Sequence, residues 1–236
     1  MTSRAVNVAV VGTGVIGAGW ATHFLARGFA VTATDPGQDA ESRLRNWIDE
    51  SWPVVERLGL ADGASRDKLA FTTDVGAAVH NADFIQESAP ERLDVQHALI
   101  ASIESAARAD TIIASSSSGL AISDVQAGAK HPERIVLGHP FNPSHIMPLV
   151  EVGGGRLTSP ENIATAMAFY SSTGKKPSAL YSAGRLCGGR RRGNLLRPWP
   201  ALGTVGSVSQ PSCFWRIRWH HTCAAASGCG PARVDP

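Results

Sequence analysis

At 236 residues, of which 43% are hydrophobic, the chain is long enough for one large domain or for one domain with a smaller second one. Its formal net charge of +2 conceals a split: residues 1–184 carry 14 Lys and Arg against 19 Asp and Glu, whereas residues 185–236 carry 8 Arg and one acid, Asp235. The first apolar run is too short for a membrane span and lacks the flanks of a secretory signal, and the arginines form no periodic face for nucleic acid. We therefore expect neither a membrane nor a nucleic-acid partner.

The predicted elements alternate between short strands and helices. Brief apolar runs predict strands at Asn7–Val11, Ala30–Thr34, Leu69–Thr72, Phe84–Glu87, Ile112–Ser115 and Ile135–Gly138, with Leu149–Val152 as the last strand. Helical spacing predicts helices at Gly14–Arg27, Asp39–Leu58, Leu93–Ala107 and Pro160–Ser172, the second of them interrupted near Pro53. This alternation predicts an α/β fold, a doubly wound parallel sheet of the Rossmann type, over residues 1–180.

A glycine-rich turn, Gly12-Thr-Gly14-Val-Ile-Gly17, joins the first predicted strand to the first helix with the spacing G-x-G-x-x-G. Gly12 permits a tight turn, Gly14 admits a pyrophosphate close to the backbone, and Gly17 lets the helix pack near the strand. Asp35 ends the second strand, where its carboxylate can accept hydrogen bonds from ribose hydroxyls and repel a 2′-phosphate. The pattern predicts NAD as the cofactor; the alternative is a glycine turn and a capping Asp without a ligand.

Hydroxyl and imidazole side chains follow two later strands. Four serines at 115–118 end one strand, and His139 ends the next inside the Pro-rich turn Gly138-His-Pro-Phe-Asn-Pro143. Because the carboxyl ends of parallel strands form the ligand crevice, His139 is well placed as a general base. A carboxylate on the neighbouring strand at 149–152 can hold its second ring nitrogen. A lone histidine is more often a hydrogen-bonded loop residue, so the surrounding motifs decide between the two interpretations.

Taken in order, these motifs resemble the NAD domain of the 3-hydroxyacyl-CoA dehydrogenase family. The resemblance covers residues 6 to about 177 and rests on GTGVIG, Asp35, Glu87–Glu91, SSSSGL and GHPFNP followed by LVEV. The family usually shows SNTSSL and HFFNP at the last two motifs. A family lysine falls at Gln96 in this chain.

The resemblance implies a role for each site residue. His139 is the base that removes the hydroxyl proton, Glu151 orients it, Ser118 hydrogen-bonds the substrate oxygen, Asn142 helps to hold that site, and Glu91 contacts the cofactor on its nicotinamide side. The implied reaction is the reversible oxidation of a secondary 3-hydroxyl group, with NAD as hydride acceptor. No metal is implied.

Two branches of this superfamily that do not act on CoA esters are more similar still: the carnitine 3-dehydrogenases and the gulonate dehydrogenases related to lambda-crystallin. The phrases GAGWATHFLARG, QESAPERLD and IASSSSGL are most similar to the carnitine branch. Carnitine carries a quaternary ammonium group, which aromatic faces bind. Trp20 and Phe141 are candidates, although the helical spacing of Trp20 is more typical of a core residue. A 3-hydroxyacyl-CoA such as 3-hydroxybutyryl-CoA, or L-gulonate, is the alternative substrate.

The last part of the chain, 181–236, follows no helical or strand period, and we expect an irregular, poorly ordered tail there. It holds all four cysteines, so that residues 1–186 have none, which fits a cytoplasmic protein. Cys213, Cys223 and Cys229 with His220 and His221 show no known zinc spacing, so a metal site is the weaker interpretation.

The resemblance implies that an all-helical domain should follow, which forms the homodimer and part of the substrate pocket and opens with a segment similar to Gly-Phe-Val-Ala-Asp-Arg. The chain has Arg-Leu-Cys-Gly-Gly-Arg at 185–190. One set of codons that encodes this segment, CGG CTT TGT GGC GGA C, gives Gly-Phe-Val-Ala-Asp when it is read one base later. We therefore hypothesise a frameshift around residues 177–184 that replaced the helical domain. An NAD-binding or structural protein without turnover is accordingly a third functional hypothesis.

Translation of the gene in its other two frames tests the frameshift hypothesis. A helical family domain should open just past residue 184 in one of them, and its absence from both rejects the hypothesis.

Overall fold

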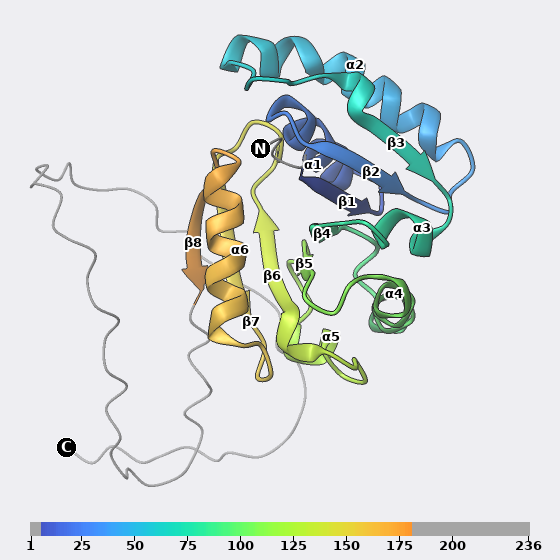
Figure 1. Cartoon of the computed structure of the whole chain (residues 1–236), viewed down its shortest axis with the longest axis vertical. Coiled ribbons are helices and arrows are strands. Elements are labelled where there is room, and N and C mark those ends of the chain that lie inside the picture. Colours follow the sequence, from blue (N-terminus) through green and yellow to red (C-terminus); the bar gives the residue numbers. More distant parts are fainter. Residues whose placement is uncertain (1–5, 181–236) are drawn as a thin grey trace, which may run out of the picture. The chain divides into compact units, whose positions relative to one another are not determined.

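The apolar runs of the sequence form the strands of one sheet in the computed structural model, which describes residues 6–180. The strands are β1 (Asn7–Val11), β2 (Ala30–Thr34), β3 (Leu69–Thr72), β4 (Phe84–Glu87), β5 (Ile112–Ser115), β6 (Ile135–Pro140), β7 (Leu149–Gly154) and β8 (Lys176–Leu180). Their order in the sheet is β3-β2-β1-β4-β5-β6-β7-β8 (Figure 1). The six strands β1 to β6 run parallel to one another, as predicted for a doubly wound sheet.

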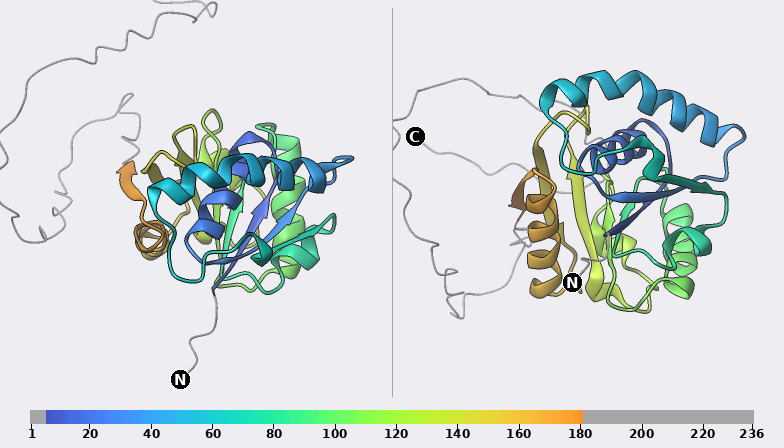
Figure 2. Two further views of the ribbon diagram at one scale, coloured as in Figure 1. Left: turned by 90° about the horizontal axis from the view of Figure 1, so that it is seen from above. Right: turned by 45° about the horizontal axis from the view of Figure 1, so that its top comes forward.

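Helices cover both faces of this sheet. They are α1 (Val15–Ala26), α2 (Ala40–Leu58), α3 (Val75–Val79), α4 (Leu93–Ala106), α5 (Ile122–Val125) and α6 (Pro160–Ser172), with short 3-10 turns η1 (Arg66–Lys68) and η2 (Pro132–Arg134). In Figure 2, α6 and α4 lie on opposite sides of the central strands. The central strands β1, β4 and β5 therefore have both side-chain faces buried, which explains why their sequence runs are largely apolar.

The alternation of side chains along β1 separates two hydrophobic cores. Val8 and Val10 belong to the core under α1, α2 and α6, whereas Ala9 and Val11 belong to the core under α3, α4 and α5. Trp20 is fully buried in the first core, where its ring stacks on Phe24 at 5.2 Å between centroids. The prediction that Trp20 is a core residue is thus confirmed.

Two details of the predicted elements were wrong. The helix α2 runs through Pro53 without a break, because Pro53 and Asp49 lie on its exposed face, where water can satisfy the Asp49 carbonyl that proline leaves unbonded.

The strand at 149–152 is not the last strand. It extends to Gly154 as β7, runs antiparallel to β6, and is followed by β8, which pairs with β7 in parallel. As a half-exposed edge strand containing Pro177, β8 has no strong apolar pattern.

The predicted tail, 181–236, lies outside the described residues, as do its cysteines and residues 181–184 of the window hypothesised for the frameshift. Among residues 6–180, none of the helices combines the length and the hydrophobicity that crossing a lipid bilayer requires.

A buried histidine connects the first helix with the end of the last one. His23 of α1 is 5% exposed, and its Nε2 lies 3.2 Å from the Thr173 hydroxyl. Burial, together with the positive charges of Lys175 and Arg27, lowers the pKa of His23 well below its ordinary value. The native protein therefore holds His23 neutral in a pH range where an unfolded chain protonates it.

This linkage predicts a loss of stability in acid. Above pH 6.5 His23 is neutral in both states, and below it the unfolded state binds the extra proton, so the free energy of unfolding falls by at most about 1.4 kcal/mol per pH unit. We expect His23→Gln to flatten this slope between pH 6.5 and 5, measured by urea unfolding. The exposed His80→Gln is the matched control and should keep the wild-type slope. Equal slopes for all three proteins would contradict the prediction.

Candidate active site at the carboxyl edge of the sheet

The glycine turn after β1 has the geometry that close backbone packing requires. Gly12 adopts φ +87°, and a Cβ on it would lie 2.7 Å from the Ser88 carbonyl oxygen. A Cβ on Gly17 would lie 1.9 Å from the Gly12 carbonyl oxygen, so α1 can approach the turn only with glycine there. A Cβ on Gly14, by contrast, would have no protein atom within 4 Å. The space beside Gly14, at the first turn of α1, is therefore open to a ligand.

A cleft of about 380 Å³ lies beside this turn. It brings together residues from the first turn of α1 and from the segments that directly follow β1, β2, β4 and β5: Gly12, Gly14, Ile16, Asp35, Ser88, Ala89, Pro90, Glu91, Ser116 and Ser117. Four of the five predicted cofactor residues line it, and Gly17 supports the turn from behind. These residues fit a dinucleotide, since the open helix N-terminus suits a pyrophosphate and the acid at the end of β2 suits a ribose.

Asp35 ties the end of β2 to the glycine turn. Its Oδ2 accepts hydrogen bonds from the Thr13 amide at 2.8 Å and the Thr13 hydroxyl at 3.1 Å, and its Oδ1 accepts one from the Gly37 amide at 2.8 Å. Each carboxylate oxygen can accept two bonds, so Oδ1 retains capacity for a hydroxyl of the ligand. The carboxylate therefore both fixes the turn and offers a negative charge at the cleft.

Glu91 and Ser118, for which the family resemblance implies different roles, contact each other. The carboxylate of Glu91 accepts bonds from the Ser118 amide at 2.5 Å, the Ser118 hydroxyl at 3.0 Å and the Gly119 amide at 3.1 Å. Partial burial opposes ionisation of Glu91, but these hydrogen bonds outweigh it and lower the pKa of the carboxyl. An ionised Glu91 thus holds the serine turn after β5 beside the cleft.

His139 and Glu151 form a cross-strand pair. They are directly opposite each other in the antiparallel β6–β7 ladder, and His139 Nδ1 lies 3.0 Å from Glu151 Oε2. The two side chains are 25% and 29% exposed, and His139 Nε2 has no hydrogen-bond partner within residues 6–180. Contact at Nδ1 leaves Nε2 as the nitrogen that faces a proton donor. This is the arrangement of a general base with an orienting carboxylate.

The pair and the cleft share one edge of the sheet. Ser115 of β5 is opposite Leu137 of β6, so Ser117 and His139 both lie two residues beyond the same register position. Both residues lie at the carboxyl ends of their strands, and the glycine turn lies at the carboxyl end of the parallel strand β1. The structure therefore places the predicted base at the cofactor edge, next to the strand that lines the cleft.

Asn142 does not join this group. It follows Phe141 in the turn after β6, its peptide bond to Pro143 is cis, and it lines a separate hollow of about 410 Å³ together with Val15 and Trp47. The Phe141 ring, in contrast, lies 5.7 Å from the His139 ring. The turn thus presents Phe141 toward the base and Asn142 toward helices α1 and α2.

Sequence reasoning missed two residues that hold this turn. The Ser144 hydroxyl donates to the Ile16 carbonyl of α1 at 3.1 Å, and buried Lys175 donates to the carbonyls of Ser144 at 2.5 Å and Met147 at 2.8 Å. Burial, and secondarily the charge of Arg27, lowers the pKa of Lys175 to about 7. A single lysine 31 residues along the chain from Ser144 gives no pattern from which this contact could be predicted.

Gln96, at the position of the family lysine, turns inward. It is 1% exposed, and its Nε2 donates to Glu87 Oε1 at 2.9 Å. Burial raises the pKa of Glu87, although hydrogen bonds from Ser115 and Gln96 oppose the shift. In this chain the position stabilises a buried acid under the cleft.

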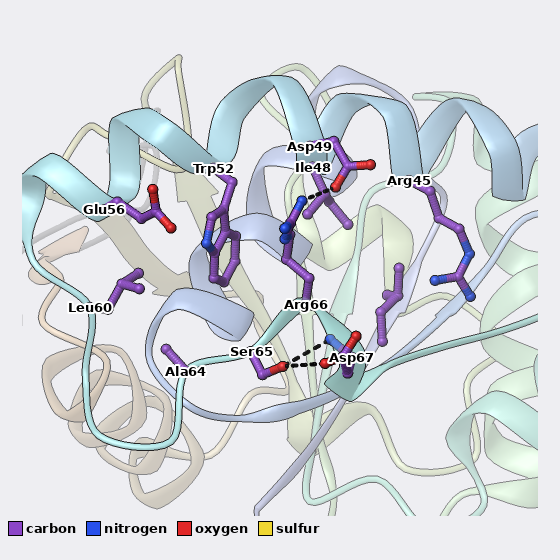
Figure 3. Close-up of a pocket in the computed structure, with 11 residues that line it drawn as sticks. Arg45, Ile48, Asp49, Trp52, Glu56, Leu60, Ala64, Ser65, Arg66 and Asp67 are labelled. Carbon is purple, nitrogen blue, oxygen red and sulfur yellow. Dashed lines mark hydrogen bonds and ion pairs between the residues drawn. The ribbon is translucent and has the colours of Figure 1, made fainter.

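A second hollow of about 440 Å³ lies between α2 and the segment around η1 (Figure 3). Several of its polar groups pair with one another: Arg66 is ion-paired with Asp49 and lies over the Trp52 ring, and Ser65 bonds to Asp67. It shares no lining residue with the glycine-turn cleft. Among the residues that Figure 3 draws, it contains no histidine or cysteine and none of the predicted site residues.

Comparison with known proteins defines the class of this domain. A family model described as 3-hydroxyacyl-CoA dehydrogenase, NAD binding domain, matches residues 7–182. The chain belongs to this family, and its cofactor is NAD. It is similar to L-carnitine dehydrogenases: 54% identity over 169 residues for that of Streptomyces griseus, and 51% over 169 residues for that of Pseudomonas putida. These matches cover 72% of this chain and 50% and 53% of the relatives, so the chain spans about half their length.

Solved structures agree with the fold. A 5-formyl-3-hydroxy-2-methylpyridine 4-carboxylic acid 5-dehydrogenase, described as an NAD+-dependent dismutase, superposes with a TM-score of 0.70 and is 36% identical. The match covers 75% of this chain and 58% of that one. The 3-hydroxybutyryl-CoA dehydrogenase of Escherichia coli K12 superposes with a TM-score of 0.69 at 31% identity, over 75% of this chain and 38% of that one.

The contrast between two glycines gives a test of the cofactor cleft. Gly14→Ala adds a methyl group where the protein has no atom within 4 Å, so the free energy of unfolding should change by no more than about 1 kcal/mol. The same methyl group would occupy the space of the ligand, so the affinity for NADH should fall at least about tenfold. Gly17→Ala should lower both the free energy of unfolding and the affinity for NADH, because its Cβ would collide with the Gly12 carbonyl. NADH fluorescence titration and thermal unfolding measure the two effects. Unchanged NADH affinity in Gly14→Ala would show that the ligand lies elsewhere.

Proposed function

We propose that this chain carries the cofactor-binding and proton-transfer half of a dehydrogenase that oxidises the 3-hydroxyl group of L-carnitine. The observation that carries the proposal is the His139–Glu151 pair, at 3.0 Å, on the sheet edge that also forms the glycine-turn cleft. The substrate is taken from the relatives of about 50% identity that are named L-carnitine dehydrogenase.

The residues divide the work of such a reaction. Gly12, Gly14 and Asp35 hold NAD, which supplies a hydride acceptor at C4 of its nicotinamide ring when bound. Nε2 of His139 accepts the hydroxyl proton while the carbon loses its hydride, so that a secondary alcohol becomes a ketone. The Glu151 carboxylate accepts a hydrogen bond from Nδ1–H of His139 and, while it stays ionised, stabilises the imidazolium that forms. General-base assistance of this kind contributes about 10²–10⁴-fold in rate.

Three further residues complete the proposed site. Glu91 contacts the cofactor near its nicotinamide, and Ser118 bonds to the substrate oxygen after its hydroxyl turns from Glu91. Asn142 is proposed to hold the turn that follows His139, since it lies in that turn and lines the hollow against α1 and α2. The support for Asn142 is therefore positional.

The proposed substrate also fits the aromatic residue at the site. The Phe141 ring is half-buried and lies 5.7 Å from the His139 ring, so it is the aromatic residue we propose to contact the quaternary ammonium group. Trp20 is fully buried between Phe24 and Tyr170 and cannot contribute. A 3-hydroxyacyl-CoA is the second candidate, favoured by the likeness to the 3-hydroxybutyryl-CoA dehydrogenase of E. coli.

The partner, the location and the domain boundary are proposals of the same kind. We propose a cytoplasmic domain over residues 1–180, because residues 1–186 contain no cysteine, as suits a reducing compartment. A homodimer like that implied by the family resemblance requires parts beyond this domain. An NAD-binding fragment without turnover is the alternative if those parts are also required for catalysis.

A substrate panel tests the proposal. NADH formation, followed at 340 nm, is expected to be faster with L-carnitine than with 3-hydroxybutyryl-CoA or L-gulonate. The variant His139→Asn should lower kcat by about 10²–10⁴-fold and keep the wild-type affinity for NADH. Glu151→Gln should lower kcat less and move the pH dependence of kcat, because its partner nitrogen loses a carboxylate. NADH binding without turnover on any of the three substrates, in this chain and in a frame-corrected one, would reject the dehydrogenase and leave the binding fragment.

A further inference from the structure

A buried polar network lies directly behind the cleft and reaches both the cofactor floor and the strand of the base. At its centre is Gln86 of β4, which has no exposed surface. Its Nε2 donates to the Ser116 hydroxyl at 2.9 Å, to the Ala114 carbonyl at 3.2 Å and to the Gly138 carbonyl at 3.3 Å. One side chain thereby connects three neighbouring strands, β4, β5 and β6, at their carboxyl ends.

The other end of the amide is fixed by α6. The hydroxyl of Tyr170, also fully buried, donates to Gln86 Oε1 at 2.6 Å. The carbonyls of Ala114 and Gly138 can only accept, so Nε2 must face them, which fixes the amide orientation and leaves Oε1 for the Tyr170 hydroxyl. Burial raises the pKa of Tyr170, so this hydroxyl stays protonated and can donate. The contact is also close to the base, because a Cβ on Gly138, the residue before His139, would lie 2.0 Å from the Tyr170 oxygen.

The network opens into the cleft through two serines. The hydroxyl of Ser116, which receives the bond from Gln86, lies 2.8 Å from the hydroxyl of Ser88, and both residues line the cleft. A serine hydroxyl rotates to suit its hydrogen-bond partners. Because Gln86 always donates to the Ser116 oxygen, it restricts the directions in which the two serine hydroxyls can donate toward the cleft. The side chains that flank Gln86 on this face of the sheet are apolar and belong to the first core: Phe84 in β4, Val10 in β1 and Ala114 in β5.

We propose that Gln86 is a positioning residue that couples the floor of the cofactor cleft to the peptide that carries His139. It fixes the Ser116 hydroxyl and the Gly138 carbonyl with the same amide, so the cofactor and the base keep one relative placement. The inference rests on the proposed function for its role in catalysis, whereas the coupling itself needs only NAD binding and an imidazole at position 139.

The test uses variants that keep the shape of the side chain. Gln86→Met removes every polar contact at similar length, and Tyr170→Phe removes only the bond to Oε1. Gln126→Met is the matched control: Gln126 is also a buried amide whose Nε2 bonds to Pro132, Ile135 and Thr158, at the amino end of β6 and away from the cleft.

Two readouts that do not depend on turnover decide the outcome. We expect Gln86→Met to weaken NADH binding by about threefold to tenfold, the range that one buried hydrogen bond gives, and to shift the ¹⁵N imidazole signals of His139, assigned through His139→Asn. Tyr170→Phe should give smaller changes of both kinds, and Gln126→Met should lower the melting temperature with neither change.

Loss of thermal stability in Gln86→Met with wild-type NADH affinity and wild-type His139 signals would overturn the proposal and leave a structural residue. Because carnitine is absent from the assay, a chain that binds NADH but fails the substrate panel can still confirm the coupling. The two proposals therefore fail separately.

Discussion

The register of β6 against β7 is the constraint on which the proposed chemistry depends. Glu151 reaches Nδ1 of His139 only because the two residues are directly opposite each other in the antiparallel ladder. A shift of one residue would turn one of these side chains to the other face of the sheet. Here β7 has almost no freedom to shift, since Val150 and Val152 are fully buried in the first core and alternate with Glu151. Hydrophobic packing thus sets a polar contact at the sheet edge.

Buried polar groups hold the segments that packing alone leaves free. The turn after His139 has few apolar anchors, and Ile146 and Met147 in it are partly exposed. Lys175 donates to two carbonyls of this turn, and the Ser144 hydroxyl of the turn donates to α1. Gln86 donates to the Gly138 carbonyl, directly before His139. Such groups are costly to bury without partners, so their contacts have defined geometry. The edge that offers a base to solvent is therefore built on satisfied amides and an ammonium group beneath it.

What could be predicted from the sequence follows the range of the interactions. The glycine turn, the strand ending in Asp35 and the helix α1 are local patterns, and the structure places them as predicted. The His139–Glu151 contact was predictable as well, because neighbouring strands at one sheet edge and a family resemblance both indicated it. The strand β8 and the contacts of Lys175 depend on partners far along the chain, and no periodicity records them. Pro53 misled the prediction because its effect on a helix depends on which face is exposed, and that is a property of the tertiary structure.

This domain identifies the cofactor more directly than it identifies the substrate. A dehydrogenase of a pyridine carboxylic acid and one of 3-hydroxybutyryl-CoA share its fold at 36% and 31% identity, although their named substrates have little in common. Residues 6–180 combine a cleft that fits a dinucleotide with the proposed base, His139, at the same edge of the sheet. His139 remains a quarter exposed there, whereas hydride transfer is favoured by a site that excludes water. Under the proposed function, substrate choice therefore requires contacts beyond those that hold the dinucleotide and orient His139, and about half of the relatives' length lies outside the match.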